Sequence, residues 1–211
     1  MSTTGSTSAV DCLFCDVQAQ PARDLDWYDR PLAQVPGVGA VIPGLGAFVP
    51  GYVLIFPEQH VESILKIPRE RSDAFSLLLA KTAKAIRAVY GPLTIFEHGS
   101  CTRRDLRRSA CLDHAHIHLL PGSYGLLCHL QKLGRISLDR TDFSGLVEHV
   151  GYLYLHEPTL APRYCPDPGV SQFFRKRIAE QMGIPEEWDY LMYPRLDNVR
   201  QTVSRLKGQL L

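Results

Sequence analysis

Residues 114–120 restrict the fold of this chain more than any other segment, because imidazole and apolar side chains alternate along it. The segment has the sequence His-Ala-His-Ile-His-Leu-Leu. In a β-strand, successive side chains point to opposite faces of the sheet. The alternation therefore predicts a strand that carries His114, His116 and His118 on one face and buries the apolar side chains on the other.

Three histidines on one strand face also predict a functional site. Histidine has an unperturbed pKa of about 6.5, so it can act as acid, base, nucleophile or metal ligand near neutral pH. Burying several such rings is costly unless something uses them. We therefore expect chemistry at this face.

The composition predicts one globular domain, or one domain with an extension, because the chain has 211 residues of which 45% are hydrophobic. Its 23 basic and 22 acidic residues leave a net charge of +1, which provides no global field for nucleic acid or an anionic membrane. No apolar run reaches the roughly 18 residues that a membrane-spanning helix needs. Residues 1–10 lack the pattern of a signal peptide and are expected to form a flexible tail. We therefore expect a cytoplasmic protein with a small-molecule ligand.

The order of apolar patterns predicts an α+β fold with an antiparallel sheet. Residues 36–51 are rich in Gly and Pro and predict a long connection, and residues 98–113 predict a polar loop. We expect a core at 11–122 and an extension of the same domain at 123–211. Strands are expected at 27–35 (an edge strand), 52–56, 93–97, 114–120, 152–157 and 160–164, and helices at 69–90, 143–151, 171–182 and 197–206.

Cys12-Leu13-Phe14-Cys15 opens the folded part of the chain. In a reducing compartment a close cysteine pair is not expected to belong to a disulfide framework. No thioredoxin-like pattern surrounds it, which weakens a redox interpretation. The pair therefore favours a metal clip.

Three motifs together resemble the histidine triad superfamily of nucleotide hydrolases and transferases. They are the triad segment 114–120, the strand Gly-Tyr-Val-Leu-Ile-Phe-Pro-x-x-His at 51–60, and the Cys-x-x-Cys pair. The resemblance covers about residues 12–122. It implies a curved sheet of about five strands crossed by a long helix, usually paired in a homodimer whose two sheets become continuous.

The resemblance also implies a mechanism. His116 would attack the α-phosphate of a nucleotide conjugate and form a covalent nucleoside monophosphate intermediate. His118 would line the phosphate site, and His114 would support it. Such an intermediate divides one difficult displacement into two easier ones.

The same resemblance implies a structural zinc site. Tetrahedral zinc needs four N/S ligands, and a closed set leaves no position for a reactive water. The expected ligands are Cys12, Cys15, His60 and His114.

Some residues depart from the family's pattern and are expected to alter substrate recognition. Tyr52 stands where members commonly have His, and Cys111 lies in a turn that usually carries Gln and Ser or Thr. The acidic residue that usually grips the ribose has no clear counterpart among residues 43–45. We expect Tyr52 and Cys111 in the substrate site.

The predicted loop before the triad adds charged candidates. Arg103 and Arg107 could hold a polyphosphate or an anionic acceptor, or they could belong to a solvated loop. Glu97 and His98 end the preceding strand and are further site candidates. In the extension, three consecutive cations, Arg175 to Arg177, are expected on the exposed face of their helix.

Several functions are compatible with the sequence. The leading hypothesis is a hydrolase that releases nucleoside monophosphate to water. A nucleotidyltransferase or phosphorylase would instead pass it to phosphate, a sugar phosphate or another metabolite. Outside this chemistry, the chain could be a zinc hydrolase that uses His114 and His116, or a non-catalytic nucleotide-binding module.

Overall fold

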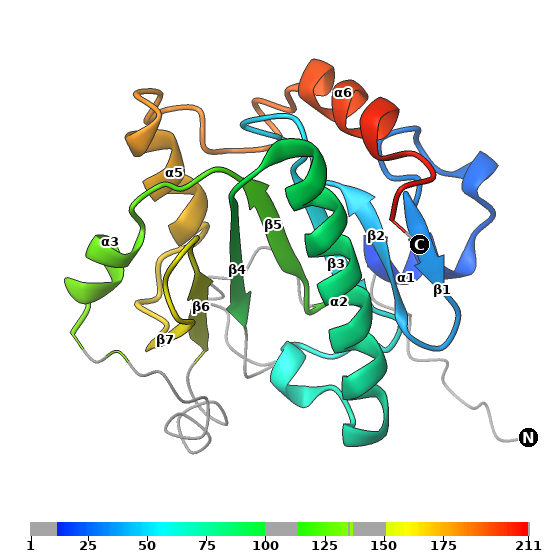
Figure 1. The fold of residues 1–211 in the computed structure, drawn as a ribbon, viewed down its shortest axis with the longest axis horizontal. Helices are drawn as coiled ribbons and strands as arrows, with labels where there is room; N and C mark the ends of the chain where they lie inside the picture. Colours follow the sequence, from blue (N-terminus) through cyan, green and yellow to red (C-terminus); the bar gives the residue numbers. More distant parts are fainter. Residues whose placement is uncertain (1–11, 100–113, 135, 137–150, 211) are drawn as a thin grey trace, which may run out of the picture.

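The computed structural model describes residues 12–99, 114–134, 136 and 151–210 (Figure 1). Its centre is a seven-stranded antiparallel sheet in the order β1-β2-β3-β5-β4-β6-β7, two strands more than the five that the family resemblance implies. The strands are β1 Ala33–Val35, β2 Gly39–Pro43, β3 Val53–Pro57, β4 Leu93–Gly99, β5 Ile117–Pro121, β6 Tyr152–His156 and β7 Arg163–Pro166. The helices are α1 Leu13–Ala19, α2 Arg69–Tyr90, α3 Leu127–Gln131, α5 Phe173–Gln181 and α6 Leu196–Leu206, with 3-10 turns η1 Ala22–Asp24 and η2 Ile64–Lys66.

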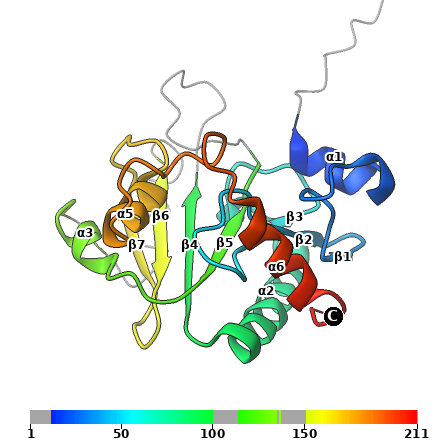
Figure 2. The same ribbon diagram turned by 90° about the horizontal axis from the view of Figure 1, so that it is seen from above.

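The two faces of the sheet have different partners. Helix α2 packs on one face, where its apolar side chains meet those of β3, β4 and β5 in one buried cluster. Helix α5 lies across the opposite face near β4 and β6 (Figure 2). The predicted α+β class and the long helix are confirmed.

Strand β2 corrects the prediction of a long connection at 36–51. All five of its residues are buried, and it pairs along its length with β3. The strand has a glycine at position 39 because the backbone of β3 comes very close there. A Cβ on Gly39 would lie 2.2 Å from the carbonyl oxygen of Phe56. The strand expected at 27–35 is shortened to β1 and lies at the edge of the sheet, as predicted.

The part of the chain beyond residue 122 joins the same sheet. Strand β6 pairs with β4 from Ile95↔His156 to Gly99↔Tyr152, and β7 pairs with β6. The helices expected at 171–182 and 197–206 are present as α5 and α6. The helix expected at 143–151 lies almost entirely outside the described residues.

Within the described ranges, no helix combines the length and apolar character needed to cross a bilayer.

Candidate active site and metal centre

Four metal-ligating side chains meet where α1, the end of β3 and the start of the triad segment converge. The ligand atoms of Cys12, Cys15, His60 and His114 all lie within 4.8 Å of one another. Cys12 Sγ lies 3.5 Å from Nδ1 of His114, and Cys15 Sγ lies 3.3 Å from Nδ1 of His60 and 3.6 Å from Nδ1 of His114. The predicted ligand set is therefore brought together.

The donor set fits a zinc ion. Tetrahedral zinc with its usual bond lengths to sulfur and nitrogen places neighbouring S and N ligands about 3.5 Å apart. The observed separations are within a few tenths of an ångström of that spacing. Two thiols and two imidazoles form a closed set, which is typical of a structural site. These four residues are consistent with structural zinc.

Hydrogen bonding prepares His114 to act as a ligand. Its Nε2–H donates to the carbonyl oxygen of Pro57 at 2.8 Å, which leaves the lone pair of the neutral ring on Nδ1, the atom next to the thiols. Burial lowers the pKa of His114 to about 4, so the ring is neutral at pH 7, as metal ligation requires.

His116 is oriented by the backbone. Its Nδ1–H donates to the carbonyl oxygen of His114 at 2.9 Å, so the lone pair of the neutral ring is on Nε2. The side chain is partly exposed and lines a cavity. Burial lowers the pKa of His116 to about 4. At neutral pH the ring is therefore unprotonated, and the Nε2 lone pair is chemically able to act as a base or a nucleophile.

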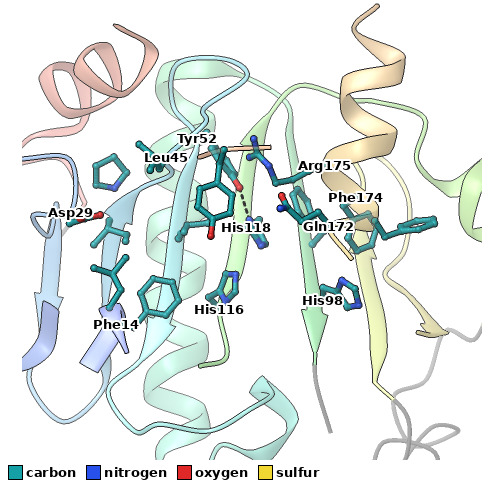
Figure 3. A pocket seen from close by; sticks show the side chains of 17 residues that line it. Phe14, Asp29, Leu45, Tyr52, His98, His116, His118, Gln172, Phe174 and Arg175 are labelled. Atoms are coloured by element: carbon teal, nitrogen blue, oxygen red, sulfur yellow. Dashed lines mark hydrogen bonds between the residues drawn. The ribbon is translucent and has the colours of Figure 1, made fainter. Parts of the chain in front are cut away.

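His118 occupies the centre of the sheet, between Leu54 of β3 and Phe96 of β4. Phe96 stacks on its imidazole with ring centroids 4.4 Å apart. The hydroxyl of Tyr52 makes a 2.6 Å hydrogen bond with Nδ1 of His118 (Figure 3). Burial, then the charges of His116 and Arg175, hold the pKa of His118 well below its ordinary value. Strand β5 itself begins at Ile117, three residues later than predicted, but the alternation still places His116 and His118 on one face.

A cavity of about 140 Å³ opens over these two histidines. One side of the cavity is formed by α1, β2 and the turn that precedes β1. The other side is formed by β4, α5 and the segment after α5 (Figure 3). Its lining includes Phe14, Asp29, Ile42, Leu45, Tyr52, Phe96, His98, His116, His118, Gln172, Phe174, Arg175 and Tyr190. The cavity is apolar except for a few polar groups.

The two site candidates at the end of β4, Glu97 and His98, point to opposite faces of the sheet. His98 lines the cavity, and its Nε2 lies 3.0 Å from Oδ1 of Asp167. Glu97 points to the other face, because neighbouring residues of a strand alternate. Its carboxylate accepts hydrogen bonds from the Tyr152 hydroxyl and from the backbone N–H of Ile64.

The structure therefore brings Tyr52, His98, His116 and His118 together at the cavity and leaves Glu97 out of its wall. Arg103, Arg107 and Cys111 fall outside the described residues.

Arg175 contradicts the expectation of an exposed helix face. Its side chain lines the cavity, and the residue is only 6% exposed. Asp29 was also missed by the sequence interpretation. It lines the cavity from the turn before β1, and burial, followed by the charge of Asp26, raises the pKa of its carboxyl to about 6. No local sequence signal identifies either residue, because both reach the site through tertiary packing.

Comparison with known proteins gives matches to solved structures. No protein-family model matches the chain, and no curated protein matches it. A member of the HIT family from Bacillus subtilis is 19% identical over 53% of this chain and 73% of its own, with a TM-score of 0.42. A hypothetical histidine triad nucleotide-binding protein from Sulfolobus tokodaii is 19% identical over 52% of this chain and 68% of its own, with a TM-score of 0.40. A Zn-bound histidine triad family protein from Mycobacterium smegmatis is 20% identical over 65% of this chain and 90% of its own, with a TM-score of 0.40.

These three structures are histidine triad proteins. The sequence motifs of this chain resemble the same family.

Proposed function

We propose that this protein cleaves a nucleotide conjugate or a dinucleoside polyphosphate at the α-phosphate through a covalent intermediate on His116. The observation that carries this proposal is the hydrogen bond from Nδ1–H of His116 to the carbonyl oxygen of His114. It fixes the tautomer that leaves Nε2 as a nucleophile, on a side chain that lines the cavity.

The reaction proceeds in two steps. In the first, Nε2 of His116 bonds to phosphorus while the bond from phosphorus to the leaving group breaks, and the electron pair of that bond goes to the leaving group. In the second, water bonds to phosphorus, the N–P bond breaks, and nucleoside monophosphate and a proton are released. The electron pair of the N–P bond returns to His116, which is ready for another cycle.

His118 and Tyr52 support the phosphate. We assign the Tyr52 hydroxyl as the donor of its hydrogen bond with Nδ1 of His118, which places the proton of the neutral ring on Nε2. That N–H is the donor available to a phosphate oxygen. Phe96 stacks on the ring and restricts its rotation.

The wall formed by α1 and β2 suits a nucleoside. Phe14, Ile42 and Leu45 offer apolar contact for a base. Asp29 offers a carboxyl group that can accept hydrogen bonds from ribose hydroxyls. Asp29 thus supplies the acidic group that residues 43–45 lack.

The metal site would play a supporting part. Cys12, Cys15, His60 and His114 would hold the zinc, which would cross-link α1 to the triad segment. His116 is not in this cluster, and its Nδ1 is engaged by a backbone carbonyl. This arrangement disfavours a zinc hydrolase in which His114 and His116 would share an open metal.

Intact-mass spectrometry tests the proposal. Protein would be incubated with diphosphates and phosphoramidates of the four common nucleosides, and we expect a mass increase of one nucleoside monophosphate, which names the base. His116→Ala should abolish the adduct, and His129→Ala, a change to a histidine of α3 outside the cavity, should leave it intact. An adduct that survives in His116→Ala would assign the nucleophile elsewhere, and no adduct or turnover with any nucleotide would favour a binding module.

The acceptor separates a hydrolase from a transferase or phosphorylase. Adding inorganic phosphate or a sugar phosphate to the isolated adduct would yield nucleoside diphosphate or a nucleotide sugar if the protein is a phosphorylase or transferase. Release of nucleoside monophosphate at the same rate with and without these acceptors is expected for a hydrolase.

Assembly and location remain predictions. A cytoplasmic homodimer without nucleic-acid or membrane partners is expected from the sequence and the family resemblance. Sedimentation equilibrium would check the homodimer, since a mass near 23.7 kDa would show a monomer.

A further inference from the structure

Arg175 is a buried cation at the start of α5. Only 6% of the residue is exposed. Its Nε–H donates to the carbonyl oxygen of Trp188 at 2.7 Å, and Nη2 donates to that of Gly46 at 3.0 Å. The guanidinium carbon also lies 4.6 Å from the ring centroid of Phe48 and 5.8 Å from that of Tyr190.

All of these partners are neutral. No carboxylate of the described residues lies within ion-pair distance of Arg175. A buried charge is costly unless an opposite charge compensates it. Nη1 makes no hydrogen bond within the described part of the chain and is not among its enclosed unpaired atoms, while the residue lines the cavity. Arg175 therefore has an N–H pair available to a ligand in the cavity.

A second polar group on the same turn lacks a partner. Gln172, in left-handed backbone conformation at the start of α5, lines the cavity, and its buried Oε1 makes no hydrogen bond with described residues. Rotating the amide by 180° would place its NH2 donors at that position, since the two ends of an amide have nearly the same shape.

These groups occupy one side of the cavity. Figure 3 shows Phe14, Asp29 and Leu45 on one side of the two histidines, and Gln172 and Arg175 beyond His118 on the other. A nucleotide conjugate that places its α-phosphate at His116 extends in both directions. The nucleoside fits the first side, so the group attached to the α-phosphate reaches the second.

We propose that Arg175, with Gln172, forms a subsite for an anionic leaving group, so that the enzyme prefers conjugates that release phosphate or a polyphosphate over conjugates that release a neutral amine. This inference rests on the proposed function. When the P–O bond breaks, its electron pair remains on the departing oxygen, and the guanidinium offsets the negative charge that gathers there. An amine takes up a proton as it departs and gains little from a nearby cation.

The experiment compares two leaving groups on one nucleoside. The probes are the diphosphate, which releases phosphate, and the phosphoramidate, which releases ammonia, of the nucleoside identified by the adduct mass. The variants are Arg175→Met, which keeps the bulk against Phe48, Arg175→Lys, which keeps the charge, and Arg177→Met as a control, because Arg177 pairs with Glu180 outside the cavity wall.

We expect Arg175→Met to lower kcat/KM for the diphosphate by about 10- to 100-fold, the usual effect of losing a hydrogen bond to a charged group. The phosphoramidate should change by less than about threefold. Arg175→Lys should restore part of the diphosphate rate, and added ethylguanidinium should partly rescue Arg175→Met. Arg177→Met should resemble the wild type with both probes.

Equal losses with both probes would assign Arg175 to folding of the segments around Gly46 and Trp188 and overturn the subsite. Pyrophosphate binding, measured by calorimetry on wild type and Arg175→Met, separates this failure from failure of the proposed function. If wild type forms no adduct but binds pyrophosphate, and Arg175→Met does not bind it, the proposed reaction fails and the anion subsite stands. If wild type does not bind pyrophosphate, or if Arg175→Met binds it as tightly as wild type does, the subsite is wrong.

Discussion

Phe14 packs against His116, with ring centroids 5.2 Å apart and the rings inclined by 60°. Phe14 stands between the two cysteines of the metal cluster and is fully buried. It also stacks on Phe56 of β3 at 4.2 Å between centroids. The segment that supplies two metal ligands therefore also forms the surface on which the proposed nucleophile rests.

Loss of the metal should therefore reduce both stability and activity. We expect about one zinc per chain in protein purified without chelator. Cys15→Ser should lose most of it and lower the free energy of unfolding by several kcal/mol, because the binding energy of a structural metal is folding energy. Metal analysis and denaturant unfolding would check this, with Cys128→Ser, a change to an exposed cysteine, as the control. A Cys15→Ser variant with wild-type stability would contradict the structural role.

The hydroxyl of Tyr52 should contribute to turnover through His118. Tyr52→Phe removes the 2.6 Å hydrogen bond to Nδ1 but keeps the ring. We expect kcat/KM to fall about three- to tenfold, the effect of one neutral hydrogen bond, with little loss of stability. Steady-state kinetics would measure it against Tyr28→Phe, whose hydroxyl bonds to the exposed Asp26 outside the cavity wall. Equal rates for both variants would mean that this hydrogen bond is not used.

Glu97 should make stability depend on pH. Burial raises the pKa of its carboxyl from 4.5 to about 7, against the opposing effect of its hydrogen bonds from Tyr152 and Ile64. The folded state therefore binds a proton more tightly than the unfolded state does, so stability falls as pH rises from about 4.5 to 7. The loss is on the order of 3 kcal/mol, from 1.36 kcal/mol per pKa unit.

Glu97→Gln provides the comparison, because its side chain has nearly the same shape and no ionisation in this range. Urea unfolding at several pH values should show a flatter profile for the variant than for the wild type between pH 4.5 and 7. Parallel profiles would show that Glu97 does not carry this dependence.

Gly46 should tolerate alanine poorly. A Cβ at this position would lie 2.5 Å from Cβ of Tyr190 and 2.6 Å from Nη2 of Arg175, and the backbone has a φ of +69°. Gly183 has a φ of +75° but nothing within 4 Å of the added atom. Both substitutions incur backbone strain of roughly 1 kcal/mol, so the clash is the difference between them.

We expect Gly46→Ala to be less stable than Gly183→Ala by about 1–3 kcal/mol, as for other overpacked sites. Thermal unfolding would measure this. Equal melting temperatures would mean that the surroundings of Arg175 and Tyr190 give way freely.

Short-range periodicity accounts for what the sequence predicts well. The alternation at 114–120 identifies the strand and the shared face of His116 and His118, and the apolar spacing at 69–90 gives the bounds of α2. The metal ligands were predicted although Cys12 and His114 are 102 residues apart, because the family resemblance implies this set of two thiols and two imidazoles.

Features that depend on tertiary contacts were not predictable in this way. The partner of Arg175 at Gly46 is 129 residues away, and the local run of cations favours an exposed surface. Strand β2 is only five residues long and its ends are Gly39 and Pro43, so its composition resembles a turn. Glu97 and His98 lie on opposite faces because side chains alternate along β4, but their partners Tyr152 and Asp167 are known only from the fold.

The pairing of β6 with β4 has a consequence for assembly. In a sheet of β1 to β5 alone, β4 would be an outer strand whose backbone could add a second molecule, but β6 pairs with it from Ile95 to Gly99. The outer strands of the described sheet are β1, with three residues, and β7, which ends at Pro166. Short and proline-bearing edges are poor templates for strand addition. Strand β6, from the C-terminal half of the chain, occupies the place beside β4. Two copies that associate therefore cannot form a continuous sheet through β4.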